Sequence, residues 1–327
     1  MMRKAFYNAL RMQKLQDSQT SAESWQVENY RVLPIEELFQ RLETVGIQLD
    51  KASFTELSTF WDSPEEFSDA LLDSQSEPAF YDQAYLLIFE IWRRLFPERV
   101  NLALFCDELD HQIELYDQGD EDHLEELEDA LAQLVVILDE QVDDGADSKD
   151  VWALVCASCA HDLESFLYDF IAEQIEAHND SYVSELLEDF STYVDDVKWF
   201  ALLNVRLLLH TDTEDGEVLL EALFHKAIEE KDLDFDFEVL ETLLKGGSQT
   251  QFVQLAEQIA RLLYSEGEFL DLLSICAEYM RHYENEQGEK AIQKLIKEHS
   301  QIPPENSVKS KKSDIETVLD LLRSSKK

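Results

Sequence analysis

The sequence predicts an all-α protein, built as an α-solenoid-like array of antiparallel helical hairpins, with an irregular helical bundle as the alternative. Three observations lead to this prediction. Apolar residues recur at steps of three and four through most of the 327-residue chain, which places them on one face of a helix. The eight glycines fall between such periodic segments, as expected for helix ends and tight turns. Strand-like alternation occurs only over residues 232–238, which is too short and isolated to predict a sheet.

Residues 120–178 form the central element of this array. Two long helical patterns are joined there by a short acidic turn at residues 143–147. The second pattern, residues 149–178, carries apolar side chains on one side and carboxylates on the other, so we expect one continuous helix. The two patterns together predict a hairpin with an apolar inner face and a strongly negative outer face. The apolar stripe of the first pattern consists of Leu124, Leu127, Leu131, Leu134 and Leu138.

The rest of the chain divides by composition into regions of different character. We expect an N-terminal helical region at 1–76, a central acidic helical region at 77–212, helical hairpins at 213–300, and a linker with a short amphipathic helix at 301–327. Besides the central hairpin, the expected helices cover residues 2–17, 78–96, 98–118, 217–230 and 234–245, with two shorter helices between residues 180 and 210. The helix at 78–96 is apolar on nearly every side and is expected in the interior. The C-terminal helix is expected to dock on its own chain, with a partner's groove as the alternative.

The chain is strongly acidic, with 71 Asp and Glu residues against 27 Lys and Arg residues. The acidity is concentrated in residues 101–200, which hold 29 acidic and two basic residues, a net charge of 2 − 29 = −27. Such a field attracts cationic partners and repels nucleic acids and anionic membranes. An alternative is a surface that serves solubility alone.

The cellular compartment can be inferred from the cysteines and from the absence of targeting signals. The chain has four cysteines, no recognisable secretory signal at its start, and no run of about 20 apolar residues that could cross a bilayer. We therefore expect a soluble, cytoplasmic protein with reduced thiols.

Residues 253–286 resemble a tetratricopeptide repeat, a helix-turn-helix unit of about 34 residues. Ile259 and Ala260 stand at the Leu-Gly pair of that repeat, Leu263 at its first aromatic position and Cys276 at its second, with a similar interhelical turn at 264–269. The chain departs from the repeat in having Ala256 at the usual Trp, a large residue, Leu272, at the small position of the second helix, and no closing proline. The resemblance implies stacked helical pairs with a concave surface that binds peptides, and it implies no catalysis.

Candidate metal and redox motifs are weak. Cys156 and Cys159 have the spacing of a zinc or redox pair, but His161 would point to the other side of a continuous helix, so both are interpreted as core residues. Glu108 and His111 have the spacing of a di-iron ligand pair, but they lie opposite the apolar stripe and are expected to be exposed. The chain has no phosphate-binding glycine loop, nucleophile elbow or EF-hand loop.

These observations favour a non-enzymatic scaffold, adaptor or chaperone that presents a concave and acidic helical surface to basic partner proteins, without a metal or other cofactor and without direct contact to nucleic acid or membrane. One alternative is an acidic mimic of nucleic acid, or a chaperone of nucleic-acid-binding proteins. A carboxylate-metal enzyme is a less favoured alternative. The carboxylates expected to bind the partner surround the central hairpin: Asp117, Asp120, Glu121, Asp122, Glu125, Asp143, Asp144 and Asp147.

Overall fold

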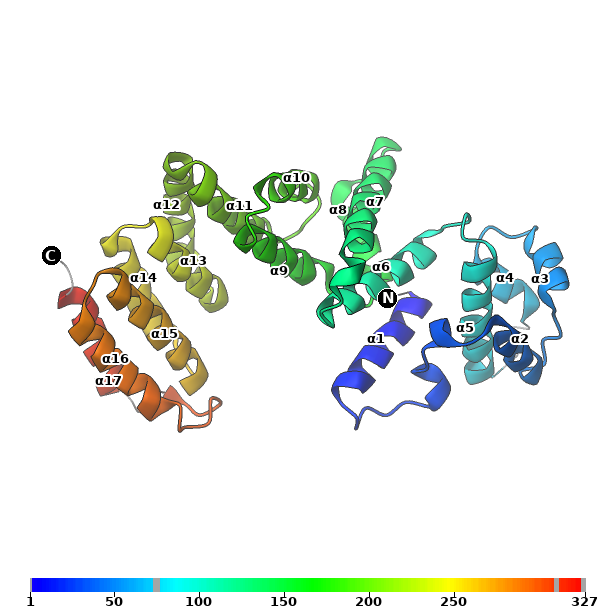
Figure 1. Cartoon of the computed structure of the whole chain (residues 1–327), viewed down its shortest axis with the longest axis horizontal. Helices are drawn as coiled ribbons and strands as arrows, with labels where there is room; N and C mark the ends of the chain where they lie inside the picture. Colours follow the sequence, from blue (N-terminus) through cyan, green and yellow to red (C-terminus); the bar gives the residue numbers. More distant parts are fainter. Residues whose placement is uncertain (1, 73–76, 309–311, 325–327) are drawn as a thin grey trace. The chain divides into compact units, whose positions relative to one another are not determined.

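The computed structural model confirms the all-α prediction (Figure 1). It describes residues 2–72, 77–308 and 312–324. Within these residues the chain forms α-helices and short 3-10 helices, and the only β-type pairing is an isolated antiparallel bridge between Ser265 and Ser307. None of the described helices is long and apolar enough to cross a membrane.

The chain folds into two compact units, Met1–Phe166 and Leu167–Lys327, which we call unit 1 and unit 2. The division falls inside α9 (Leu163–Glu176). The helices before it are α1 (Arg3–Gln16), α2 (Ile35–Thr44), α3 (Lys51–Ser58), α4 (Pro64–Leu71), α5 (Pro78–Leu95), α6 (Leu102–Asp117), α7 (Leu124–Asp143) and α8 (Ser148–Ser158), with 3-10 turns η1 (Ser24–Gln26), η2 (Tyr30–Val32) and η3 (Glu121–His123). The four regions expected from composition stay a prediction.

Helix α5 is the centre of the unit 1 core, as its all-round apolar sequence predicts. Every side chain from Ala84 to Trp92 is buried, and α2 and α4 pack against it. The charged member of this run is Glu90, which lies between the guanidinium groups of Arg93 and Arg94 at 2.7 and 2.6 Å. A buried carboxylate needs such partners because its desolvation is otherwise very costly.

The predicted central hairpin is correct in its first half and wrong in its second. Helix α7 buries four leucines of the predicted stripe, while Leu124 at its start is half-buried, and the turn at 143–147 leads into α8. The expected single helix over 149–178 is broken after Ser158 into α8 and α9. The break is stabilised from outside, because Asp110 on α6 accepts hydrogen bonds from the backbone N–H groups of Ala160 and His161 at 2.9 and 3.1 Å.

Unit 2 is a stack of helices whose contacts follow chain order. Helix α11 packs on α12 and on α13, and α13 packs on α12, α14 and α15, so that α11, α13 and α15 lie in one layer with α12 and α14 behind them. This arrangement is an array of helical hairpins, as predicted. The helices are α10 (Asp180–Phe190), α11 (Val197–Thr211), α12 (Thr213–Glu230), α13 (Leu233–Gly246), α14 (Gln249–Leu262), α15 (Glu266–His282), α16 (Glu286–His299) and α17 (Lys312–Ser324).

Helix α12 begins earlier than predicted. The acidic segment before the helix expected over 217–230 becomes its first turn, with the carboxylate of Asp212 accepting a hydrogen bond from the N–H of Asp215. Gly216 therefore lies inside a helix, where it permits close packing: a Cβ at this position would lie 2.9 Å from the backbone nitrogen of Leu209. The prediction that every glycine separates helices was wrong here.

The C-terminal helix α17 docks on its own chain. It packs on α14, α15 and α16, and it places Val318, Leu319 and Leu322 in the core of unit 2. Arg323 holds the end of the helix through an ion pair with Glu257 at 2.8 Å. Docking in cis was the expected arrangement. Whether residues 253–286 are a true tetratricopeptide unit stays a prediction, although α14 and α15 occupy its two helices.

Candidate functional site

The eight predicted partner-binding carboxylates do not form one surface. Five lie around the start of α7 and three lie around the turn after it. Since α7 has 20 residues and rises ~1.5 Å per residue, the two groups are about 25–30 Å apart. The side chains of Asp117, Asp122, Glu125, Asp143, Asp144 and Asp147 are exposed and that of Asp120 is partly exposed, whereas Glu121 lies in η3 with its side chain outside the described residues.

Some of these carboxylates have local structural roles. Asp147 caps α8 by accepting a hydrogen bond from the N–H of Lys149 at 2.9 Å. Asp120 accepts one from the N–H of Asp122 at 3.3 Å, and the carboxylate of Asp117 lies 4.0 Å from the His161 ring. The exposed members can still supply a negative field, but none of them lines either of the pockets described below.

A concave acidic site lies instead in unit 2, on the layer formed by α11, α13 and α15. It is a shallow, open pocket of about 390 Å³, which we call the acidic pocket. Helix α13 forms its floor because its pocket residues recur at i, i+3, i+4 and i+7 and so share one face. The opposite face of α13 is buried in the core. The lining residues are Trp199 of α11, Asp234, Phe237, Glu238 and Glu241 of α13, and Asp271, Ser274 and Ile275 of α15.

The ring of Trp199 is held in place by aromatic neighbours. It makes edge-to-face contacts with Tyr168 and Phe235, each with ring centroids 5.3 Å apart. Such pairs add about 0.5–1.5 kcal/mol beyond area burial and fix ring orientation. The indole therefore presents a defined surface to the pocket.

The carboxylates of the acidic pocket fall into two electrostatic classes. Glu238 is compensated, because it forms an ion pair with Arg206 and accepts a hydrogen bond from the Tyr168 hydroxyl at 3.1 Å. The carboxylates of Asp234, Glu241 and Asp271 form no hydrogen bond or ion pair with other described residues. They therefore face the pocket without a cation in direct contact.

The raised pKa values of two of these carboxyl groups also reflect the scarcity of favourable partners around them. Partial burial raises the pKa of Glu241 above its ordinary value, and the neighbouring Glu238 raises it further, against smaller opposing effects of Arg206 and Lys245. Burial also raises the pKa of Asp271, with Glu268 as the nearby negative charge. A raised carboxyl pKa means that the ionised form lacks favourable partners, so a bound cation would stabilise both groups.

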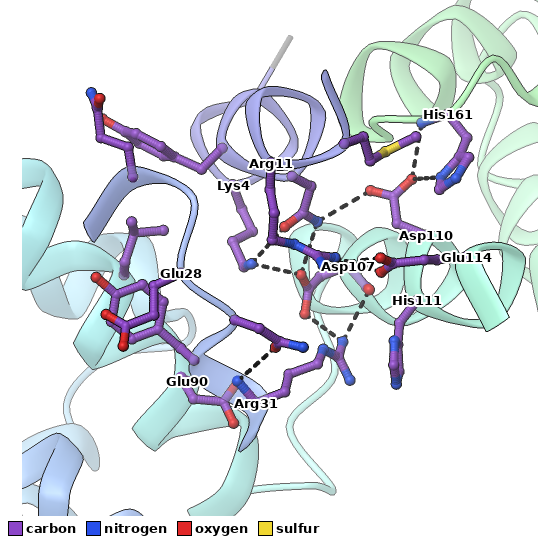
Figure 2. Close-up of a pocket in the computed structure, with 17 residues that line it drawn as sticks. Lys4, Arg11, Glu28, Arg31, Glu90, Asp107, Asp110, His111, Glu114 and His161 are labelled. Carbon is purple, nitrogen blue, oxygen red and sulfur yellow. Dashed lines mark hydrogen bonds and ion pairs between the residues drawn. The ribbon is translucent and has the colours of Figure 1, made fainter. Parts of the chain in front are cut away.

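The most enclosed polar site of unit 1 has the opposite character (Figure 2). Asp107 of α6 is buried and lies 2.8 Å from the Lys4 ammonium and 2.5 Å from the Arg31 guanidinium. Asn8 donates hydrogen bonds to Asp107 at 2.9 Å and to Asp110 at 3.3 Å. We call Lys4, Asn8, Arg31, Asp107 and Asp110 the α1 network, because it fixes α1 on α6. Burial alone would raise the pKa of Asp107, but Lys4 and Arg31 outweigh burial and lower it.

The α1 network leaves little room for a ligand. The cavity beside it measures about 30 Å³, which is enough for one or two waters, since each needs roughly 10–15 Å³ by this measure. Arg11 closes one side through two hydrogen bonds to Glu114, at 3.0 and 2.5 Å (Figure 2). This site is therefore a structural ion-pair cluster that attaches a basic helix to an acidic one.

The residues considered as di-iron ligands belong to the edge of this cluster. Glu108 pairs with Arg31 at 2.8 Å. His111 is half-buried, contrary to the expected exposure, because the segment that carries Arg31 covers this face of α6. Burial and the charge of Arg31 lower the pKa of His111, which favours the neutral imidazole.

The cysteines lie in or beside the core, as expected from their interpretation as core residues. Cys106, Cys159 and Cys276 are buried and Cys156 is partly buried, all as free thiols. Hydrogen bonding to Cys106 and burial raise the pKa of Cys159, so its thiol form is stabilised. His161 bonds to Asp110 at 3.0 Å instead of approaching the sulfur atoms.

Among the described residues, the group whose ligand atoms converge as a metal would require is His178, Asp180 and His210, in unit 2. Sequence inspection missed this group because His210 lies 30 residues beyond Asp180. It also missed the acidic pocket, although acidic residues at 234, 238 and 241 follow a helical period that could have revealed the shared face.

No family model matches this chain, and no curated protein or solved structure is significantly similar to it. Functional inference therefore depends on the geometry and electrostatics described above.

Proposed function

We propose that this chain is a non-enzymatic interaction protein, a scaffold, adaptor or chaperone, that binds a basic segment of a partner protein in the acidic pocket of unit 2. The observation that carries the proposal is one concave site that combines the aromatic residues Trp199 and Phe237 with three carboxylates, those of Asp234, Glu241 and Asp271, that form no hydrogen bond or ion pair with other described residues.

This combination suits lysine and arginine side chains. Their cationic groups bind carboxylates through charge-assisted hydrogen bonds, and their aliphatic stems cover apolar rings while the charged end stays at a polar rim. A guanidinium over the face of an indole adds a cation–π contribution of about 0.5–2 kcal/mol. The pocket supplies both kinds of group.

The size of the pocket favours a short extended segment over a folded partner domain. A volume of about 390 Å³ lies in the range of sites that accept a small ligand, about 300–1,000 Å³, and so accommodates one or two long side chains. The layered helices α11, α13 and α15 resemble in arrangement the concave peptide-binding layer that a tetratricopeptide-like array implies, which supports the same mode of binding.

The exposed carboxylates of unit 1 act at longer range in this proposal. Residues 101–166 of unit 1 hold 20 acidic residues and one lysine, a net charge of 1 − 20 = −19, which attracts a basic partner across roughly the ~8–10 Å Debye length of physiological salt. The predicted residues around α7 therefore raise the rate of encounter more than the final affinity. The free cysteines support a reducing, cytoplasmic compartment.

The proposal is tested with a 12-residue peptide rich in lysine and arginine and lacking tryptophan, titrated into the full chain. Trp199 is the one tryptophan of unit 2 in the sequence, so a fluorescence change that disappears in Trp199→Phe reports binding at the pocket. Reversing two pocket charges, Glu241→Lys with Asp271→Lys, is expected to weaken binding at least about tenfold, because two favourable charge contacts become repulsive.

The matched control reverses two exposed charges on α12, Glu217→Lys with Glu229→Lys, which changes the net charge equally outside the pocket. It is expected to alter the affinity less than about twofold. Equal losses in both double variants, together with complete loss of binding at about 0.5 M salt, would favour imitation of nucleic acid by bulk charge. Unchanged binding in the pocket variant would refute the proposal.

A further inference from the structure

A second site in unit 2 brings together three side chains that are typical metal ligands. One ligand atom each of His178, Asp180 and His210 lies within 4.8 Å of the other two, and the two imidazole centroids are 5.5 Å apart. We propose that these residues bind one Zn²⁺ ion. The proposal is independent of peptide binding in the acidic pocket.

The fold brings these residues together from two places. His178 and Asp180 occupy the tight connection between α9 and α10, where the N–H of His178 donates to the carbonyl of Ile175 and that of Asn179 to the carbonyl of Gln174. His210 lies in the last turn of α11, which packs along α10. A bound ion would therefore tie the α9–α10 connection to the end of α11.

The carboxylate of Asp180 provides an independent observation. Its Oδ1 atom is buried and accepts no hydrogen bond from the described residues. Leaving a buried polar atom without a partner costs on the order of 1–3 kcal/mol, more for a charged group, so such an atom requires an explanation. Coordination of a cation would satisfy it.

The backbone conformation of His178 places its ring at the site. His178 has φ of 60°, in the left-handed region that ends many helices and that Lys231 and Glu284 also adopt. It puts an exposed imidazole beside Asp180. Glycine occupies this region at lower cost than histidine.

The donor set selects the class of metal. Two imidazoles and one carboxylate suit zinc and its neighbours in the first transition row, and they suit Mg²⁺ and Ca²⁺ poorly because those ions prefer oxygen ligands. Zinc binds such ligands at ~2.0–2.2 Å, which brings tetrahedral ligand atoms to roughly 3.3 Å from one another. The exposed rings of His178 and His210 can make this small adjustment, and a water completes four-coordination.

The surrounding charge also favours a cation. The sequence from residue 167 to residue 197 contains nine acidic residues and no lysine or arginine. The segment that carries His178 and Asp180 therefore has a strongly negative formal charge, which a divalent ion reduces.

The test is a titration of ZnCl₂ into the metal-free full chain in competition with a chromophoric chelator. We expect one tight site, and a loss of affinity of at least about 100-fold in His178→Gly and in His210→Ala, since even outer-shell changes cost 10–100-fold. His178→Gly is the decisive variant, because glycine suits the backbone conformation. It should fold with unchanged or higher Tm while losing zinc binding and the zinc-induced rise in Tm.

His225→Ala is the matched control, since His225 is an exposed histidine with a carboxylate, Glu221, 4.0 Å away. It should bind zinc like the parent chain. Substitution of Co²⁺ for zinc distinguishes the ligands spectroscopically: a weak visible band without a thiolate-to-metal charge-transfer band supports the site. A thiolate band, or a zinc affinity that survives both histidine substitutions, would overturn the proposal in favour of the cysteines or of unspecific binding.

Discussion

The α1 network of unit 1 and the acidic pocket of unit 2 both gather carboxylates, and they differ in the supply of cations. Asp107 is matched by Lys4 and Arg31, whereas the carboxylates of Asp234, Glu241 and Asp271 form no ion pair with any cation among the described residues. The first arrangement stabilises the fold and leaves a cavity of only about 30 Å³. The second leaves charge and space available for a partner. In a chain this acidic, the position of the few basic residues separates carboxylates with a structural role from those left available for the proposed binding.

The largest effect is expected from Asp107→Asn. Removing one partner of a buried ion cluster leaves the others uncompensated and typically costs about 3–5 kcal/mol. Urea unfolding of the full chain should show this loss, whereas Asp150→Asn, at an exposed position on α8, should change stability by less than about 0.5 kcal/mol. A comparable, small effect in both variants would contradict the structural role of the network.

The same site predicts a pH dependence. Because the pKa of Asp107 is lowered in the folded chain, its ionised form favours folding. This contribution is present above the ordinary aspartate pKa of ~3.9 and is lost as pH falls through the lower folded value. Acid titration of the parent chain should therefore show a decline in stability that Asp107→Asn reduces.

Asp236 should give stability the opposite pH dependence, and its substitution should have the next largest effect on stability. It is fully buried on α13 beside Gln258, whose amide donates to it at 2.8 Å, and burial raises its pKa to about 6. The carboxyl group of Asp236 stays protonated to a higher pH in the native chain than in the unfolded chain. Its contribution to folding stability therefore falls as pH rises from about 4 to about 6. The penalty above this window is up to about 3 kcal/mol.

Asp236→Asn removes that penalty, and the asparagine oxygen can still accept from Gln258. We expect a gain of roughly 1–3 kcal/mol in unfolding free energy at pH 7 and little gain near pH 4. Urea unfolding at both pH values measures the difference. A destabilised variant at pH 7 would show that the charge is compensated in the native chain.

A smaller effect on stability is expected in the acidic pocket. Glu241→Gln with Asp271→Asn removes two exposed charges that form no ion pair with other described residues, so stability should change by less than about 1 kcal/mol, with a gain favoured. Binding of the basic peptide should fall nonetheless. A large loss of stability would place these carboxylates in the structural class with Asp107.

The smallest effect is expected from substitutions in the turn after α7. Asp143→Asn, Asp144→Asn and Asp147→Asn together remove three charges, and asparagine keeps the cap of α8. Stopped-flow measurement with the basic peptide should show a few-fold slower association at low salt, an unchanged dissociation rate, and no difference at about 0.5 M salt. A change in dissociation alone would mean that these residues touch the bound peptide.

The sequence was informative wherever a helix is stabilised by its own apolar stripe. The leucines of α7 and the all-apolar α5 were interpreted correctly because burial follows directly from their periodicity. The break between α8 and α9 was missed because Asp110, about 50 residues earlier in the chain, binds the freed N–H groups. A stabilising group so distant in sequence leaves no local pattern.

The candidate sites were harder to predict for a related reason. The sequence showed where carboxylates are dense, around α7, but it did not show which of them lack cations. Glu238 and Glu241 are three residues apart, and only the approach of Arg206 from α11 distinguishes their roles. His178 and His210 likewise meet only after α9, α10 and α11 have packed.

Helix α17 covers one face of the unit 2 stack. Val318, Leu319 and Leu322 cover apolar surface on α14, α15 and α16, while the acidic side chains of Glu316 and Asp320 stay exposed. The helix thus replaces an apolar face of the stack with a charged one, and an apolar face left open to solvent favours association with other chains.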